Sequence, residues 1–257
     1  RDRSVSRGLG DVYKRQIIHG AGDELYNNAS EFYRAENGQP IGYFWGYKTA
    51  GIFQNTQEID EWRAAGNGIL QSNVQPGDVR FVDRNHDGQI NDKDKVNLGN
   101  GTPDFTLGLN LGFVYKGFDF SIVANGAFGQ QIVQSYRNHT RPTPNYTTAI
   151  LDRWHGEGTS NRIPRVTDSN INYQFSDLFI QNGDYLRLST LTLGYDFAKL
   201  FKGKAVSQAR LYFQVQNLFI ITGYDGMDPE IGFGSSNNSW VSGLDYGYYP
   251  RPRTVLV

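Results

Sequence analysis

Residues 106–128 read TLGLNLGFVYKGFDFSIVANGAF, and the interpretation of the whole chain starts from this stretch. In the range 107–115 every second residue is apolar, whereas the residues between them are mostly glycine and asparagine. Alternation with a period of two is typical of a β-strand with one apolar face. Lys116 and Gly117 predict a tight turn, after which the alternation resumes in the range 118–128. The stretch therefore predicts an antiparallel hairpin with one apolar and one polar face.

Such a hairpin could belong to a soluble β-sandwich or to a β-barrel in a lipid bilayer. A tilted strand of about ten residues is long enough to cross the apolar core of a bilayer once. Aromatic residues gather at the turn end of the apolar face, namely Phe113, Tyr115, Phe118 and Phe120. Because an aromatic girdle at the membrane interface is typical of transmembrane barrels, we favour the barrel.

Two further segments alternate in the same way, at residues 185–197 and 209–216. In the first of them the apolar residues change phase near Ser189 and Thr190, which predicts a β-bulge. The connections between the strands differ in length, with a short turn at 116–117, a long loop at 130–183, a medium connection at 198–208 and a long loop at 222–249.

Short turns at one end of the strands and long loops at the other end are typical of membrane barrels. Only about four full strands fit in this chain, which is too few to close a barrel. A further strand begins just before the chain stops at Val257. We therefore expect an incomplete barrel, in which the last strand is truncated.

The composition agrees with a β-rich membrane protein. The 257 residues include 30 glycines and 14% aromatic residues, with a mean hydropathy of −0.54. No apolar run is long enough for a membrane helix, but barrel strands alternate and therefore score as hydrophilic. The absence of cysteine excludes a disulfide scaffold and a zinc–cysteine site. A formal net charge of −1 gives no support for nucleic-acid binding.

Residues 1–16 are treated separately. They resemble translated sequencing-adapter read-through, as found at the ends of some proteins predicted from environmental DNA; a native basic arm is the alternative. We expect this segment to be non-native and exclude it from the fold.

Residues 83–94 read DRNHDGQINDKD, which matches the spacing of a calcium loop. Oxygen ligands recur at loop positions 1, 3, 5, 7, 9 and 12, and a glycine at position 6 makes the sharp turn. Gly88 occupies position 6 of this stretch. The expected ligands of a structural Ca²⁺ ion are Asp83, Asn85, Asp87, Gln89 through its backbone carbonyl, Asn91 through a water molecule, and Asp94.

Position 12 is aspartate where calcium loops usually carry glutamate, so Asp94 would bind with one oxygen or rely on Asp92. The flanking segments 78–82 and 96–99 do not resemble amphipathic helices, which argues against a regulatory EF-hand. The alternative is a solvated turn rich in Asx and Gly residues. We expect a calcium-stabilised loop on a β protein.

Several stretches of the chain, in order and over nearly all of residues 38–257, resemble the C-terminal quarter of SusC/RagA-family TonB-dependent outer-membrane transporters of Bacteroidetes. The matching stretches are GQPIGYFWGYKTAGIFQ at 38–54, GDVRFVD at 77–83, LGNGTP at 98–103, QNGDYLR at 181–187, QNLF at 216–219, YDGMDPE at 224–230 and YPRPRT at 249–254.

The resemblance implies an all-β fold, the C-terminal part of a large antiparallel transmembrane β-barrel with long extracellular loops. It implies a location in the outer membrane of a Gram-negative bacterium, in contact with its lipid. It also implies import of oligosaccharides or peptides, powered by the TonB complex through a missing N-terminal part, and a SusD-like lipoprotein as partner. We expect residues 17–103 to form an extracellular loop region and residues 104–257 to form barrel strands and loops.

No catalytic site is expected. The four histidines lack metal-protease spacing, and no nucleophile elbow, phosphate loop or dinucleotide motif occurs. Tryptophans Trp45, Trp154 and Trp240 fall in expected external loops, where their rings could contact a sugar, pack within the loops or meet the lipoprotein. The carboxylates in the range 225–230 are expected to be structural. The alternative to a transporter is a secreted β-sandwich glycan-binding module with a structural calcium loop.

Overall fold

The computed structural model describes residues 33–34, 38–40, 42–134, 148–167, 170–200, 209–231 and 242–257. The segment 1–16 and Trp240 therefore lie outside the described residues. The strands are β1 (Tyr33–Arg34), β2 (Tyr43–Gly46), β3 (Thr49–Ile52), β4 (Val79–Phe81), β5 (Val96–Asn100), β6 (Phe105–Tyr115), β7 (Phe118–Phe128), β8 (Gln131–Gln134), β9 (Ile180–Asn182), β10 (Tyr185–Asp196), β11 (Arg210–Thr222), β12 (Leu244–Asp245) and β13 (Thr254–Leu256).

Helical structure is sparse in the described part of the chain. The α-helix is α1 (Thr56–Ala64), and the 3₁₀ turns are η1 (Asp92–Asp94), η3 (Thr148–Asp152), η4 (Asn170–Tyr173), η5 (Asp177–Phe179) and η6 (Phe197–Leu200). None of the described helices has the length and apolar character needed to cross a membrane.

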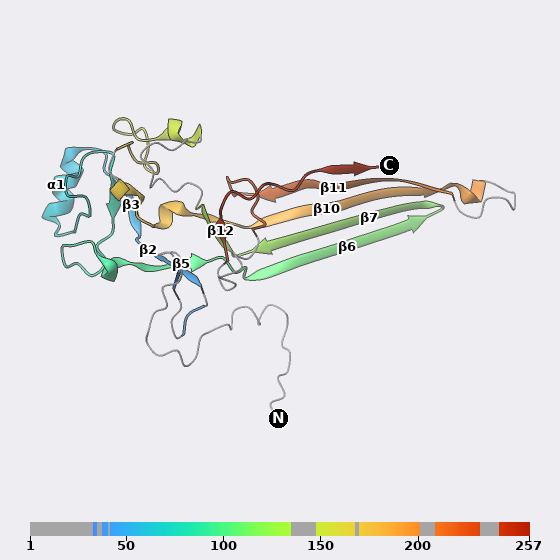
Figure 1. The fold of residues 1–257 in the computed structure, drawn as a ribbon, viewed down its shortest axis with the longest axis horizontal. Helices are drawn as coiled ribbons and strands as arrows, with labels where there is room; N and C mark the ends of the chain where they lie inside the picture. Colours follow the sequence, from blue (N-terminus) through green and yellow to red (C-terminus); the bar gives the residue numbers. More distant parts are fainter. Residues whose placement is uncertain are drawn as a thin grey trace, which may run out of the picture.

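The dominant element is a five-stranded antiparallel sheet in the order β13-β11-β10-β7-β6. Its four long strands run side by side, and a loop-rich body that contains α1, β2 and β3 lies at one end (Figure 1). The pairing of Phe105 with Phe128 and of Tyr115 with Phe118 confirms the predicted hairpin. Lys116 and Gly117 both have positive φ, 48° and 94°, as a two-residue hairpin turn of the I′ type requires.

One face of this sheet carries apolar side chains that nothing in the described chain covers. A row across four strands pairs Phe113 with Phe120, Phe120 with Leu193, and Leu193 with Phe213. Their exposed fractions are 62%, 36%, 51% and 44%. The next row toward the loop body, on the opposite face, is Gly112, Ser121, Thr192 and Gln214. The sheet is thus apolar on one side and polar on the other, as a barrel wall between lipid and a wet interior must be.

The predicted bulge is present in β10. The register shifts between Leu188 and Thr190 against both neighbouring strands: Ser189 is the extra residue opposite β7, whereas opposite β11 it faces two residues, Asn217 and Leu218. Its hydroxyl is bonded to Asn125 Oδ1 on β7. Because the bulge absorbs one residue, Leu188 and Leu191 both stay on the apolar face despite their odd separation.

The buried core lies in the loop-rich body. One cluster consists of Tyr33, Phe44, Val133 and Leu244, and the other consists of Tyr47, Val79, Phe81 and Ile90. Small sheets frame these clusters, in the orders β1-β2-β5, β3-β4 and β12-β8-β9. The loop-rich body therefore has its own packed interior, and it positions the sites described next.

Helix α1 belongs to this body, and the sequence analysis did not predict it. Asn55 caps the helix by accepting a hydrogen bond from the Glu58 backbone N–H at 3.0 Å. Glu58 Oε2 in turn accepts from the Gln54 backbone N–H at 3.0 Å. Ile59 is the buried residue of the helix. A side-chain cap and one buried apolar residue make this nine-residue helix hard to recognise from periodicity alone.

Candidate functional site: an acidic loop and a polar cavity

The acidic loop 83–94 connects β4 to β5 and ends in η1. Gly88, at the sixth position, has a φ of 79°, a conformation that L-residues rarely adopt. His86, two residues earlier, also has a positive φ, of 56°. The backbone therefore makes the sharp turn that the spacing predicts.

Asp83 is the most deeply placed carboxylate of the loop, with 1% of the residue exposed. Its Oδ2 accepts hydrogen bonds from the backbone N–H groups of Gly88 at 2.8 Å and Gly68 at 3.0 Å. Its Oδ1 is buried and has no hydrogen-bond partner. Since an unpaired buried carboxylate oxygen is costly, a cation at this position would satisfy it.

Asp94 closes the loop from the other end. Its Oδ1 accepts from Arg84 N at 2.9 Å, and its Oδ2 accepts from Asn91 N at 2.8 Å. The side chain is buried, so these two bonds fix both ends of the loop to one carboxylate. Asp92, the other acidic residue here, is paired with Lys95 at 2.8 Å, and Lys95 lowers the pKa of the Asp92 carboxyl.

The remaining predicted ligands lie on the exposed side of the loop. Asn85 Nδ2 donates to Asp87 Oδ2 at 2.9 Å, and this bond is the main cause that lowers the pKa of the Asp87 carboxyl. Asn91 Oδ1 accepts from Lys93 N at 3.0 Å. In the part of the chain that the structure describes, no three His, Cys, Asp or Glu side chains converge closely enough to hold a metal ion. A cation here would need the amide and carbonyl oxygens of Asn85 and Gln89 as well as carboxylates.

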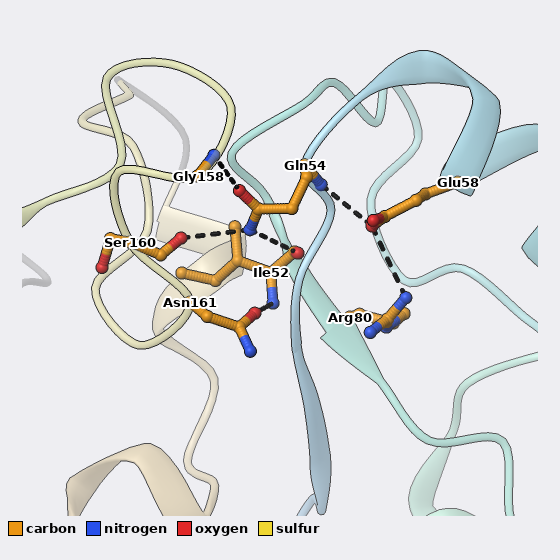
Figure 2. Close-up of a pocket in the computed structure, with 7 residues that line it drawn as sticks. All are labelled: Ile52, Gln54, Glu58, Arg80, Gly158, Ser160 and Asn161. Atoms are coloured by element: carbon orange, nitrogen blue, oxygen red, sulfur yellow. Dashed lines mark hydrogen bonds and ion pairs between the residues drawn. The ribbon is translucent and has the colours of Figure 1, made fainter.

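A second feature, which the sequence analysis missed, is a polar cavity of about 220 Å³ beside the N-terminus of α1 (Figure 2). Its walls come from β3, β4, the start of α1 and the segment 158–161. The residues that line it are Ile52, Gln54, Glu58, Arg80, Gly158, Ser160 and Asn161. We refer to it below as the polar cavity.

Gln54 holds the two sides of the polar cavity together. Its Nε2 donates to the backbone oxygens of Ile52 at 3.0 Å and Ser160 at 3.1 Å. Its Oε1 accepts from Gly158 N at 2.9 Å and from Trp154 Nε1 at 3.2 Å. All donor and acceptor positions of this amide are thus used. Its bonds link segments about a hundred residues apart in sequence.

Arg80 and Asn161 complete the walls. Arg80 donates from Nε and Nη2 to Ala50 O at 3.1 and 2.7 Å, while its Nη1 lies 3.6 Å from Glu58 Oε2. Asn161 Oδ1 accepts from Ile52 N at 2.9 Å. This approach needs Gly51, where an added Cβ would lie 2.4 Å from the same oxygen. The cavity is therefore rigidly built from main-chain and side-chain bonds.

Of the three tryptophans that the sequence analysis named as possible sugar contacts, Trp45 and Trp154 lie among the described residues. Arg34 stacks over the Trp45 ring, 3.9 Å from its centroid. Trp154 uses its indole N–H to hold Gln54, and its ring edge packs against Gly77. Trp62, on α1, donates from Nε1 to Gly68 O at 3.2 Å and lies 5.2 Å from the Arg80 guanidinium. The structure thus places Trp154 directly behind the polar cavity.

Two of the three carboxylates of the 225–230 segment, Asp228 and Glu230, form ion pairs, whereas Asp225 accepts a hydrogen bond from Gln134 Nε2. Arg187, which is 4% exposed, donates from Nη2 to both oxygens of Asp228 at 2.6 and 2.8 Å. Its Nε lies 3.0 Å from Glu230 Oε2 but without hydrogen-bond alignment. Glu230 Oε1 is paired with Arg251 at 2.8 Å. Each carboxylate of this network faces an arginine, so the segment is fastened to β10 and shows no acid–base pair for catalysis.

Comparison with known proteins gives consistent matches. No family model matches the sequence. The chain is 33% identical over 231 residues to the TonB-dependent receptor P3 of Formosa agariphila, which covers 86% of this chain and 22% of that receptor. It is 31% identical over 191 residues to the TonB-dependent receptor SusC of Bacteroides thetaiotaomicron, covering 74% of this chain and 18% of SusC.

Among solved structures, the fold matches the RagAB peptide importer in its open–open state, with a TM-score of 0.64 and 20% identity. The match covers 93% of this chain and 24% of that chain. The RagAB peptide transporter gives a TM-score of 0.63 at 22% identity, covering 90% and 23%. The chain thus spans less than a quarter of the length of the relatives and structures described here.

Proposed function

The chain belongs to the SusC/RagA family of TonB-dependent receptors of the Gram-negative outer membrane, and we propose that the protein of which it is a part imports nutrients. The four long strands and β13 are part of the wall of its transmembrane barrel. Its curated relatives are receptors rather than enzymes.

The observation that carries this proposal is the uncovered apolar face of the sheet. The row Phe113, Phe120, Leu193 and Phe213 is exposed across four strands. Polar or small residues make up most of the other face, with Val114, Val123 and Tyr212 among its larger apolar or aromatic members. A secreted β-sandwich would have to bury that row in a water-soluble core, which this structure does not do. A bilayer on one side and an aqueous interior on the other satisfy both faces.

For the cargo we propose oligosaccharides or peptides, with a SusD-like surface lipoprotein as partner and the TonB complex as the energy source. The support comes from the relatives, which include SusC and the RagAB peptide importer. The loop-rich body at one end of the sheet (Figure 1) supplies a packed surface that such a lipoprotein could contact.

Spin labels test the membrane assignment in the full-length protein. Leu109 on β6 belongs to the apolar face, and its neighbour Asn110 to the polar face. A nitroxide at position 109 should relax faster with lipid-soluble oxygen, and one at position 110 with a water-soluble nickel chelate. Equal accessibility of both labels to the nickel chelate, in a particle that needs no detergent, would overturn the barrel and the import proposal together.

Uptake tests the function. Cells that express the full-length protein should grow on its cargo, from a panel of neutral glycans and peptides, only while TonB is intact. Growth on that cargo that persists after TonB is deleted would contradict energised import.

We also propose that the acidic loop 83–94 binds one structural Ca²⁺ ion. Asp83 Oδ1, buried and unpartnered, is the atom that fits a cation best. Asp87, Asn85 and the Gln89 carbonyl would complete the oxygen set from the exposed side, with Asn91 acting through water and Asp94 holding the loop ends. The ion would supply only structural rigidity.

A further inference from the structure

The polar cavity carries groups whose hydrogen-bonding capacity the described chain does not use. Asn161 Oδ1 accepts a hydrogen bond from Ile52 N, while its Nδ2 makes no hydrogen bond within the described residues. Arg80 donates from Nε and Nη2 to Ala50 O. Its Nη1 approaches Glu58 Oε2 only to 3.6 Å. Glu58 uses Oε2 toward Gln54 and leaves Oε1 without a hydrogen bond. The three residues that carry these two donors and this acceptor line one hollow.

The balance of charge in the cavity selects among ligands. Glu58 would repel an anion, and Arg80 would repel a cation. Arg80 and Glu58 already neutralise each other at 3.6 Å, so a zwitterion would have to separate this pair. A neutral ligand with adjacent hydroxyl groups can instead donate to the carboxylate and accept from the guanidinium and the amide at once.

The size of the cavity limits that ligand to one ring. Its volume of about 220 Å³ lies below the range of about 300–1,000 Å³ of pockets for drug-sized ligands. Ile52 lies in the wall of the cavity (Figure 2), but it is fully buried, so the surface that a ligand meets is more polar than apolar, as the hydroxyl groups of a sugar ring require.

We propose that the polar cavity is an accessory site that binds one ring of a neutral glycan. It lies in the loop-rich body, at the opposite end of the sheet from the Lys116–Gly117 turn (Figure 1). Its binding groups are fixed before the ligand arrives, because Gln54 and Ala50 hold the walls through the bonds described above. Little conformational freedom is then lost on binding. The site goes beyond the proposed import function, since transport through the barrel does not require it.

Ligand-observed saturation-transfer NMR on the full-length protein tests this site. The protein is kept in a detergent without a sugar headgroup, and the probes are methyl α-glucoside, methyl β-galactoside, methyl β-xyloside and glycylglycine. We expect at least one glycoside to bind and glycylglycine to give no signal. Failure of all three glycosides to bind would overturn the proposal, and binding of glycylglycine in their place would overturn the ligand class.

Two variants place the bound sugar in the polar cavity. Asn161→Asp removes the Nδ2 donor but keeps an oxygen for Ile52 N, and Glu58→Gln removes the charge but keeps an acceptor for Gln54 N. Each should weaken glycoside binding by about tenfold, the loss expected for one hydrogen bond to a charged or well-placed group. Glu61→Gln, on the exposed side of α1, is the matched control and should bind like the wild type.

The controls separate this site from folding and from transport. An unchanged melting temperature of both variants shows that the walls are intact, because each substitution preserves the main-chain bond. Wild-type affinity in both cavity variants would place the sugar elsewhere and overturn the proposal. TonB-dependent uptake is measured on the wild type and on the same variants. Absence of uptake by the wild type would bear only on the import proposal, and not on the polar cavity.

Discussion

At the scale of single residues, Asp83 carries the strongest expectation. Asp83→Asn should abolish calcium binding, because it replaces the buried oxygen that lacks a partner with a neutral amide group. The substitution should also loosen residues 77–98 and leave the strands intact. Calorimetric titration with CaCl₂ and limited proteolysis measure the two effects.

Asp60→Asn is the matched control for this experiment, because Asp60 is exposed on α1 and takes no part in the loop. A second variant, Asp87→Ala, removes a ligand from the exposed side of the loop and should abolish binding as well. Calcium affinity equal to that of the wild type in Asp87→Ala would refute the assignment of the site.

The spacing of oxygen residues predicted where this loop turns, and Gly88 confirms that turn. The sequence could not show that Asp83 also binds the backbone of Gly68, since that bond joins residues fifteen apart through a loop. It could not show the polar cavity either, because Gln54 and Asn161 meet only after two distant segments pack together. Local patterns reveal ligand spacing, whereas sites built across the fold leave no local signal.

At the scale of elements, helix α1 depends on its cap. Asn55→Ala removes the acceptor for the Glu58 N–H and should cost about 1 kcal/mol of local stability. Amide hydrogen exchange in residues 58–64 should become faster by the factor that a loss of about 1 kcal/mol corresponds to. The exchange rates in the barrel strands should be unaffected. Thr56→Ala, at the exposed first position of the helix, is the control. Equal exchange rates in Asn55→Ala and the wild type would show that packing alone holds the helix.

The bulge in β10 supports a second element-scale prediction. Deletion of Ser189 would leave Leu188 and Thr190 as direct neighbours opposite Ala124 and Val123 of β7, which keeps the faces of the strand. Two residues of β11, Asn217 and Leu218, would then have no counterpart in β10, so the pairing of these two strands should be disrupted. We expect less folded protein in the outer membrane, measured by the heat-dependent gel shift of the full-length protein. Ser189→Ala keeps the residue count and should assemble nearly normally.

This bulge was predictable because a change of phase in an alternating strand is a local signal, whereas the small sheets of the loop-rich body were not. The parallel pairing of Leu244 with Val133 joins segments more than a hundred residues apart, and neither strand exceeds four residues. Pairings of this kind depend on the packing of Tyr33 and Phe44 against them.

At the scale of the whole molecule, the two faces of the sheet should tolerate charge differently. Leu111→Lys places an ammonium group on the apolar face near the middle of β6 and should destabilise the barrel by about 2–4 kcal/mol. Asn110→Lys, one residue earlier on the polar face, should have a much smaller effect. Urea unfolding of the full-length protein in lipid vesicles measures both. Similar losses in the two variants would contradict the difference between the faces.

The position of the buried cores at one end of the long sheet has a practical consequence for producing this segment by itself. The loop-rich body can shield its clusters around Phe44 and Phe81 from water, but the long sheet has no such protection, and all of β6 is exposed. The unpaired edge and the apolar face of this sheet would associate with the same surfaces of neighbouring copies. Expressed alone in the bacterial cytoplasm, the polypeptide should accumulate as inclusion bodies, and detergent should be needed to bring it into solution.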